Sequence, residues 1–151
     1  MRIGIIGAGQ LGRMLALAGY PLALQFRFLD STADSPGAQV APIVLGPFDD
    51  PSSLRKLAGD VDLVTYEFEN VPAPALYTLG AHRPVSPSAE SVAICQDRAA
   101  EKRHFVKSGV ACAPFAVIES EADLAKVDAA LLPGILKTSR LGYDGKGQER
   151  V

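Results

Sequence analysis

The sequence has few of the residues on which metal centres and covalent catalysis usually depend. It contains two cysteines and two histidines among 151 residues. Cys95 and Cys112 do not have the spacing of metal ligands, and neither stands beside a histidine that could activate a thiol. One possible pair is also too few for a disulfide framework. His82 and His104 have no partner visible in the sequence, so we assign them no chemistry.

Long apolar runs and an excess of charge of one sign are also absent. The apolar first segment, residues 1–6, ends at Gly7 and is too short for a signal peptide or a membrane span. The net charge is −2, from 15 basic and 17 acidic residues, which gives no reason to expect nucleic acid or a membrane as partner. We expect a reduced, cytoplasmic protein, with 48% hydrophobic residues, enough for one core of ordinary size.

Strands and helices alternate along the first 95 residues. Apolar runs predict four strands, at 2–6, 25–29, 43–45 and 61–66. Helical spacing and helix-start signals predict helices after the first, third and fourth strands, at 10–19, at 51–58 and from Pro72 to about Leu79. This alternation predicts the α/β class, with a Rossmann-like, doubly wound parallel sheet over residues 1–95.

The sequence changes character in its second part, from residue 96 to residue 151. Helices are predicted at 88–95 and 96–107 and from Ser120 onward, and strands at 114–118 and 135–138. The last strand leads into a glycine-rich loop that ends at Gln148, and Val151 is the last residue. We therefore expect a hairpin begun there to find no returning strand in this chain.

Gly7-Ala8-Gly9-Gln10-Leu11-Gly12 fits the G-x-G-x-x-G pattern of dinucleotide-binding turns, and Asp30 ends the next strand. The glycines permit a tight turn, and the start of the following helix offers N–H donors to an anion. The motif alone is compatible with an NAD(P)-dependent oxidoreductase. It is also compatible with a turn that only packs a helix closely on a sheet.

Two carboxylates follow the fourth strand, in Tyr66-Glu67-Phe68-Glu69-Asn70. Open α/β sheets bind ligands at the C-terminal ends of their strands, and in an extended stretch Glu67 and Glu69 would share one face. Carboxylates there could accept hydrogen bonds from sugar hydroxyls or an exocyclic amine. A solvated acidic loop anchored by two aromatic side chains accounts for the same residues.

The third motif is the loop Gly142-Tyr143-Asp144-Gly145-Lys146-Gly147-Gln148. Its three glycines allow backbone N–H groups to turn toward an anion, and Lys146 adds a point charge. The spacing differs from that of a P-loop. Behind a strand that carries Lys137, the loop would suit the phosphates of a nucleotide. The alternative is a flexible hairpin tip with a solvated lysine.

Taken in order, these segments resemble the N5-carboxyaminoimidazole ribonucleotide synthetase family, which are ATP-grasp enzymes of purine synthesis. The resemblance rests on residues 9–14, 65–72, 96–98 with Lys102, and 136–148. It implies a pre-ATP-grasp domain over 1–95 and the beginning of an α+β ATP-grasp domain over 96–151. It also implies ATP-dependent carboxylation of 5-aminoimidazole ribonucleotide with bicarbonate, through carboxyphosphate and with magnesium.

The resemblance further implies roles for individual residues. Tyr143 and Lys146 would be catalytic, and the ribonucleotide would contact Gln10, Leu11, Glu67 and Glu69. ATP would contact Arg98, Lys137, Gly142, Tyr143, Asp144, Gly145, Lys146, Gly147 and Gln148. The magnesium ligands of the family lie in a part absent from this sequence, so we assign no metal ligand here and expect this chain alone to have no synthetase activity. Leu141 stands where the family often has a glycine, and could stiffen the loop.

Three other functions stay open. A dinucleotide-dependent oxidoreductase would use the first motif but leaves the other two unexplained. A sister ATP-grasp enzyme, such as a formate-using glycinamide ribonucleotide transformylase or a biotin-dependent carboxylase, would share the fold and differ at the Tyr-Asp pair of the loop. The third is a non-catalytic role in binding or assembly. A homodimer is possible, because the family's dimer contacts involve its N-terminal and ATP-binding domains.

Overall fold

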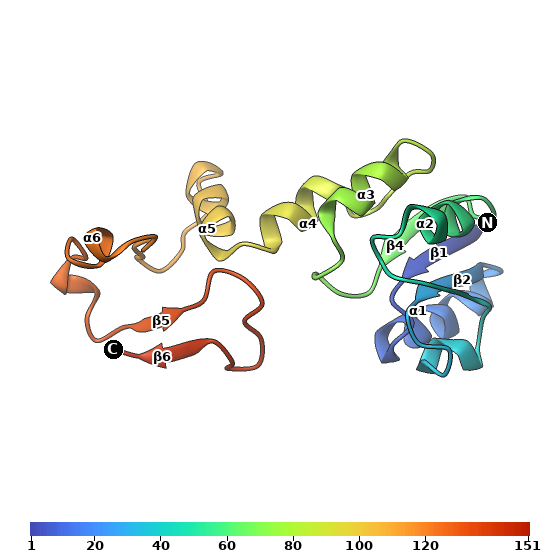
Figure 1. The fold of residues 1–151 in the computed structure, drawn as a ribbon, viewed down its shortest axis with the longest axis horizontal. Coiled ribbons are helices and arrows are strands. Elements are labelled where there is room, and N and C mark those ends of the chain that lie inside the picture. The colour runs from blue at the N-terminus through green and yellow to red at the C-terminus, as the bar shows by residue number, and fades with distance from the viewer. The chain divides into compact units, whose positions relative to one another are not determined.

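A four-stranded parallel sheet forms the centre of the first part of the chain in the computed structural model, which describes residues 1–151 (Figure 1). Its strands, in the spatial order β3-β2-β1-β4, are β1 (Arg2–Ile6), β2 (Gln25–Asp30), β3 (Ile43–Leu45) and β4 (Leu63–Tyr66). Val85 adds a parallel bridge to Val64 beyond β4. The chain builds outward from β1 in one direction and then in the other, which is the doubly wound arrangement. The predicted α/β class is confirmed.

The helices of this part begin where the sequence provides start signals. They are α1 (Gln10–Gly19), α2 (Pro51–Ala58) and α3 (Ala73–Gly80), with short 3-10 turns at Tyr20–Leu22 and Pro36–Gln39. Asp50 caps α2 by accepting a hydrogen bond from the amide of Ser53 at 2.8 Å, and Pro51 occupies the first helical position. Hydrogen bonds from the hydroxyls of Ser52 and Ser53 lower the pKa of Asp50 far below its ordinary value.

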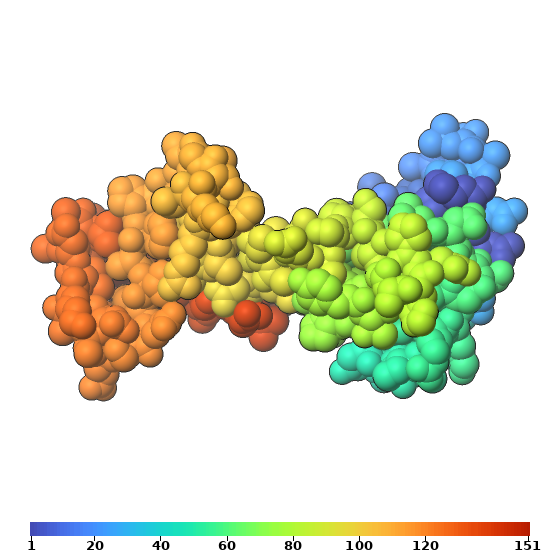
Figure 2. Space-filling view, turned by 90° about the horizontal axis from the view of Figure 1, so that it is seen from above, coloured from blue at the N-terminus to red at the C-terminus, as the bar shows by residue number.

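The sheet is covered on both faces. Adjacent residues of β1 belong to different clusters: Ile5 packs with Ala16 and Phe28, whereas Ile6 packs with Leu57 and Leu76. Side chains of a strand alternate between its faces, so β1 supplies both layers of the core. Helices α2 and α3 contact each other, and their atoms can be followed on the surface in Figure 2.

The chain divides into two compact units, Met1–Ala93 and Ile94–Val151. The second unit contains the end of α4 (Ala89–Cys95), α5 (Arg98–Lys107), α6 (Glu121–Leu124) and a 3-10 turn at Ala129–Leu131, followed by β5 (Ile135–Lys137) and β6 (Gln148–Arg150). Every buried residue of the chain lies at or before Val92. Apolar side chains of β5, Ile135 and Leu136, are about half exposed. No helix of the chain has the length and apolarity that crossing a bilayer requires.

Two predictions for the second unit are wrong. Residues 114–118 form no strand, because no neighbouring strand pairs with them and their apolar residues alone do not specify one. The glycine-rich loop does find a returning strand: β6 pairs antiparallel with β5, with Ile135 opposite Arg150 and Lys137 opposite Gln148. The short segment after the loop is long enough for three ladder pairs.

Candidate functional site

The carboxylate of Glu67 lies in the glycine turn between β1 and α1. Its Oε1 accepts a hydrogen bond from the amide of Gly9 at 2.8 Å, and its Oε2 accepts one from the amide of Gly12. This placement follows from the sheet, because Tyr66 at the end of β4 is opposite Ile6 at the end of β1. The residue after β4 therefore lies next to the turn that follows β1.

The prediction that Glu67 and Glu69 share a face of an extended stretch is wrong. Strand β4 ends at Tyr66, and residues 67–70 form a bend and a turn. Glu67 is half-buried and points back toward α1, whereas Glu69 is exposed. The aromatic side chain between them, Phe68, packs edge-on against Phe48 with ring centroids 5.4 Å apart. The bend thus separates the environments of the two carboxylates.

The glycines of the turn make room for Glu67. A Cβ atom added to Gly7 would lie 2.6 Å from Glu67 Cγ, and one added to Gly9 would lie 2.6 Å from Oε1. At Gly12 the added atom would lie 2.8 Å from Oε2. Gly7 also has a φ of +91°, which L residues with a side chain rarely adopt. The spacing that the sequence shares with dinucleotide-binding turns is therefore used here to admit a side chain of the same chain.

Asp30 is the carboxylate that an oxidoreductase would use to bind ribose, and it is hydrogen-bonded to backbone amides of the chain. It is 8% exposed, its Oδ2 accepts from the amide of Ala8 at 2.7 Å, and its Oδ1 accepts from the amide of Thr32 at 2.9 Å. A dinucleotide-binding enzyme needs this carboxylate for a ribose hydroxyl and the turn for a diphosphate. Because the carboxylate of Glu67 already fills the turn, the geometry argues against the oxidoreductase.

Two donors of the turn have no partner within the chain, namely the amides of Gln10 and Leu11. They belong to the first turn of α1, where N–H groups have no intrahelical acceptor, and the next amide, that of Gly12, is engaged by Glu67. Of the residues predicted to contact the ribonucleotide, Gln10, Leu11 and Glu67 therefore lie together at the C-terminal ends of β1 and β4. Glu69 follows on the exposed turn.

The loop from Gly142 to Gln148 connects β5 to β6 and is closed at its base. The amide of Thr138 donates to the carbonyl of Gly147 at 2.8 Å. A Cβ atom added to Gly147 would lie 2.5 Å from Thr138 Oγ1, and the φ values of Gly145 and Gly147 are +81° and +67°. These two glycines are required by the backbone of the loop.

The two residues predicted to be catalytic contact each other within this loop. Lys146 Nζ donates to the hydroxyl of Tyr143 at 2.8 Å and lies 4.5 Å from the centroid of its ring. Both are exposed, so the ammonium group has access to solvent and to a ligand. Lys137 is likewise exposed, on β5 opposite Gln148. Two of the cations predicted to contact ATP therefore lie on the hairpin, one on a strand and one on the loop.

Arg98 joins the start of α5 to the start of the loop. Its Nη2 donates to the carbonyl of Gly142 at 2.9 Å, and its backbone amide donates to the carbonyl of Ser139 at 2.9 Å. All residues predicted to contact ATP thus lie in the second unit, on the hairpin or bonded to it. The residues predicted to contact the ribonucleotide lie in the first unit.

Asp97 is a structural residue of this site to which sequence reasoning gave no role. Its Oδ1 accepts hydrogen bonds from the amides of Ala99 and Ala100, which caps α5, and also from Ser139 Oγ at 2.9 Å. Its Oδ2 forms an ion pair with Arg140 at 3.2 Å. An aspartate directly before a helix is a recognised cap signal. The prediction missed it by starting the helix at residue 96.

The hydrogen bond from the Ala100 amide, together with the Ser139 hydroxyl and the charge of Arg140, lowers the pKa of Asp97. A carboxylate with a lowered folded-state pKa contributes stability above its unfolded pKa, and this contribution is lost as the pH falls through the folded value. The contacts by which the Asp97 carboxylate connects α5 to the loop are therefore fully formed at neutral pH.

Leu141, next to the loop, has a φ of +60° and is 75% exposed. A side chain in this left-handed region costs about 1–2 kcal/mol, whereas glycine there costs about 0.4–1 kcal/mol through the entropy of the unfolded chain. We therefore expect Leu141→Gly to stabilise the hairpin by about 0.5–1 kcal/mol. Hydrogen exchange of the β5 and β6 amides measures this change.

The control for this substitution is Leu132→Gly, at an exposed leucine whose φ is −102°. This substitution adds the same conformational entropy to the unfolded chain but removes no strain from the folded one. It should therefore either destabilise the hairpin or leave its stability unchanged. Equal effects of the two substitutions would show that the conformation of Leu141 carries no strain.

Metal ligands do not gather in this chain. Nowhere do three histidine, cysteine, aspartate or glutamate side chains lie close enough together to hold a metal ion. We therefore assign no metal site in this chain and derive no step that passes through a metal.

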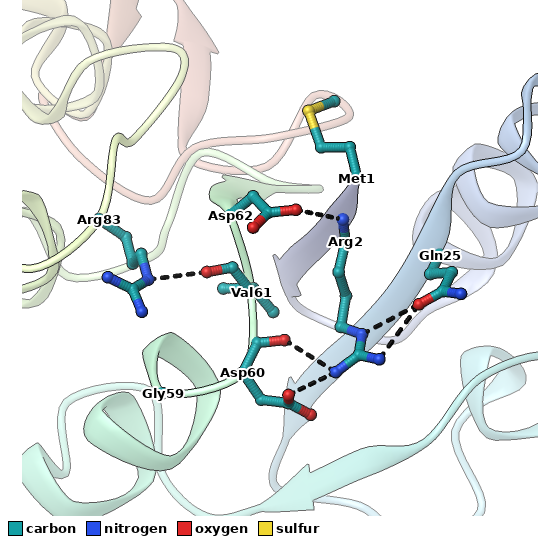
Figure 3. A pocket seen from close by; sticks show the side chains of 8 residues that line it. All are labelled: Met1, Arg2, Gln25, Gly59, Asp60, Val61, Asp62 and Arg83. Atoms are coloured by element: carbon teal, nitrogen blue, oxygen red, sulfur yellow. Dashed lines mark hydrogen bonds and ion pairs between the residues drawn. The ribbon is translucent and has the colours of Figure 1, made fainter.

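A pocket of about 410 Å³ lies at the opposite ends of the strands from the glycine turn, where β1 and β2 begin (Figure 3). Arg2 bonds there to Asp60 and, at 3.1 and 3.2 Å, to Gln25 Oε1. The amide of Arg2 donates to Asp62 at 2.7 Å, and Arg83 Nε donates to the carbonyl of Val61 at 2.7 Å. These contacts tie the amino ends of the strands together and involve none of the predicted site residues.

Comparison with known proteins places this geometry in a family. Residues 1–96 match the family model described as the ribonucleotide synthetase preATP-grasp domain. N5-carboxyaminoimidazole ribonucleotide synthase of Pseudomonas aeruginosa is 50% identical over 150 residues, which are 99% of this chain and 42% of that protein. The crystal structure of the synthetase from Thermus thermophilus aligns with a TM-score of 0.88 and 45% identity, over 99% of this chain and 40% of that one.

A third relative was solved with ligands. The N5-carboxyaminoimidazole synthase of Aspergillus clavatus, in complex with ADP and 5-aminoimidazole ribonucleotide, aligns with a TM-score of 0.85 and 33% identity, over 99% of this chain and 40% of that one. The chain thus spans about two fifths of the length of the relatives it matches. With the family model matching most of its length, the chain belongs to the ribonucleotide synthetase preATP-grasp family.

Proposed function

We propose that this chain forms part of an N5-carboxyaminoimidazole ribonucleotide synthetase. The observation that carries the proposal is the match of 99% of the chain to enzymes of that name, one of them solved with ADP and 5-aminoimidazole ribonucleotide. The chain supplies two sets of groups suited to these ligands: two backbone amides and two carboxylates at or beside the glycine turn, and a cationic hairpin loop. Residues 96–151 are accordingly proposed to be the beginning of an ATP-grasp domain.

In the proposed reaction, an oxygen of bicarbonate attacks the terminal phosphorus of ATP, and ADP leaves. The product is carboxyphosphate. The 5-amino nitrogen of aminoimidazole ribonucleotide then attacks the carboxyl carbon, the carbon–oxygen bond to phosphate breaks, and the nitrogen loses a proton. The products are the N5-carboxylated ribonucleotide, ADP and phosphate. Each step needs groups that hold negatively charged oxygens in place and that keep water from the carboxyphosphate.

The hairpin loop is proposed to hold the phosphates of ATP. Lys146 is exposed and bonded only to a neutral hydroxyl, that of Tyr143, so it can exchange this partner for a phosphate oxygen at little cost. Its charge would stabilise the transferring phosphoryl group, and Tyr143 would lie near the carboxyphosphate. Arg98 supports this arrangement by fixing the carbonyl at the start of the loop. Lys137 on β5 is the second proposed cation for the nucleotide.

The glycine turn is proposed to face the ribonucleotide. The amides of Gln10 and Leu11 are donors without an intrahelical acceptor, which suits a neutral carbonyl or hydroxyl oxygen of the ribonucleotide. Glu67 uses one acceptor position on each oxygen for the turn, and a carboxylate has about four in all. It therefore keeps capacity for a ribose hydroxyl or an amine. Glu69, exposed on the following turn, is the second proposed carboxylate for the ribonucleotide.

Magnesium, a second copy of the chain and a cytoplasmic location complete the proposal. Magnesium offsets charge on a transferring phosphoryl group, and the family resemblance implies that its ligands lie in a part absent from this sequence. A homodimer is proposed from the family resemblance. The free thiols of Cys95 and Cys112 suit the reducing cytoplasm.

The test is the dependence of phosphate release from ATP on the other two substrates, measured with the complete protein that contains this chain. We expect release only when bicarbonate and aminoimidazole ribonucleotide are both present. Release that instead requires formate and glycinamide ribonucleotide would assign the protein to a sister ATP-grasp enzyme. Release that needs neither substrate pair would contradict the ligase assignment. The 151-residue chain alone is expected to release none.

A further inference from the structure

We infer that Glu67 is a built-in anion that occupies the place which dinucleotide-binding folds give to a diphosphate. The glycine turn of such folds binds that group with backbone amides at the N-terminus of the first helix. Here the corresponding amides, those of Gly9 and Gly12, both donate to Glu67, one to each carboxylate oxygen. This inference does not rest on the proposed function, because it follows from contacts within the chain.

The steric fit supports the same conclusion. Added Cβ atoms at Gly7, Gly9 and Gly12 would each lie within 2.9 Å of an atom of Glu67. The turn is therefore closed around the carboxylate, and a phosphate could enter only if the side chain left. The charge supports it as well, since a carboxylate at a helix N-terminus is favoured by the helix dipole, whereas a second anion beside it would be repelled.

Glu67 thus acts as a positioning residue with two consequences. It excludes dinucleotides from a turn whose sequence would otherwise admit them. It also connects the end of β4 to the first turn of α1, which fixes the direction in which the amides of Gln10 and Leu11 point. The turn is already ordered before a ligand binds to those amides. The ligand therefore does not pay the cost of ordering the turn.

The test is chemical rescue of Glu67→Ala in the 151-residue chain, with Glu69→Ala as the matched control. Thermal unfolding is followed with inorganic phosphate or pyrophosphate, and with sodium chloride at equal ionic strength. We expect Glu67→Ala to unfold at a lower temperature than the wild type. Phosphate at about ten times its dissociation constant should then raise its midpoint by about 5 °C, because the emptied turn binds the anion. The wild type and Glu69→Ala should respond to phosphate no more than to sodium chloride.

An equal response of the wild type and Glu67→Ala to phosphate would overturn the inference, and so would no response of Glu67→Ala. Should that variant fail to fold with and without phosphate, Glu67→Gln decides. It keeps the shape but not the charge, and one of its two end groups cannot accept a hydrogen bond. We expect the amides of Gly9 and Gly12 to exchange at least about tenfold faster in Glu67→Gln, with those of β2 unchanged. Unchanged exchange at both glycines would overturn the inference.

Discussion

Backbone amides of β1, β2 and β4 are expected to exchange with solvent at least about a thousandfold more slowly than those of β5 and β6 in the 151-residue chain. The first unit has helices over both faces of its sheet and a core that includes Phe28, Leu57 and Leu76, each fully buried. Its amides exchange mainly by global unfolding, which for a domain of this size costs about 5 kcal/mol or more.

The second unit has none of that protection, because no residue beyond Val92 is buried. A two-stranded hairpin is marginal in water by itself, and so is a helix as short as α5, with ten residues. Hydrogen exchange read by mass spectrometry on short peptides compares the two units in one sample. Equal protection of β1 and β5 would contradict the prediction and would mean that the second unit is stabilised by contacts other than burial.

Lys146→Ala is expected to weaken ATP binding by the complete protein by about 10- to 100-fold. A hydrogen bond between a lysine ammonium and a phosphate oxygen contributes about 1.5–3 kcal/mol, because both partners are charged. Lys146 has only the Tyr143 hydroxyl to leave, so little of this is lost in breaking the existing contact. Isothermal titration with ADP and with a non-hydrolysable ATP analogue measures the effect directly.

Lys126→Ala is the matched control, since it removes the same charge from an exposed position of the same unit outside the loop. Its dissociation constants should equal those of the wild type. Should Lys146→Ala bind both nucleotides as tightly as Lys126→Ala does, Lys146 makes no contact with the phosphates. The proposed role of the loop would then have to rest on its backbone amides alone.

The elements of the first unit were largely predictable because local signals and the tertiary fold agree there. Helix α2 begins at Pro51 after an aspartate cap, and β3 is a short apolar strand at Ile43–Leu45, as predicted. The second unit was less predictable because its strands depend on partners. Residues 114–118 are apolar but pair with nothing, and β6 reads as polar yet forms a strand because β5 lies beside it.

The candidate site was predictable in its residue types but not in its contacts. The sequence indicated that Glu67 follows a strand and that the turn at Gly7 offers N–H donors to an anion as one of two interpretations. It did not indicate that these two features satisfy each other, because the pairing of β4 with β1 brings together residues 55 and 58 positions apart. The roles of Asp97 and Arg98 at the loop depend in the same way on contacts more than 40 positions apart.

Because Glu67 fills the glycine turn from within the chain, the G-x-G-x-x-G pattern has to be interpreted differently in uncharacterised chains. A glycine pattern after the first strand does not distinguish a cofactor enzyme from a protein that fills the turn itself. The residue that follows the fourth strand distinguishes the two, because a glutamate there can accept hydrogen bonds from the amides of the turn whereas a small or apolar residue cannot. In a chain with the same sheet order, a glutamate at that position therefore indicates a turn that is filled from within, and a cofactor assignment there needs evidence beyond the glycines.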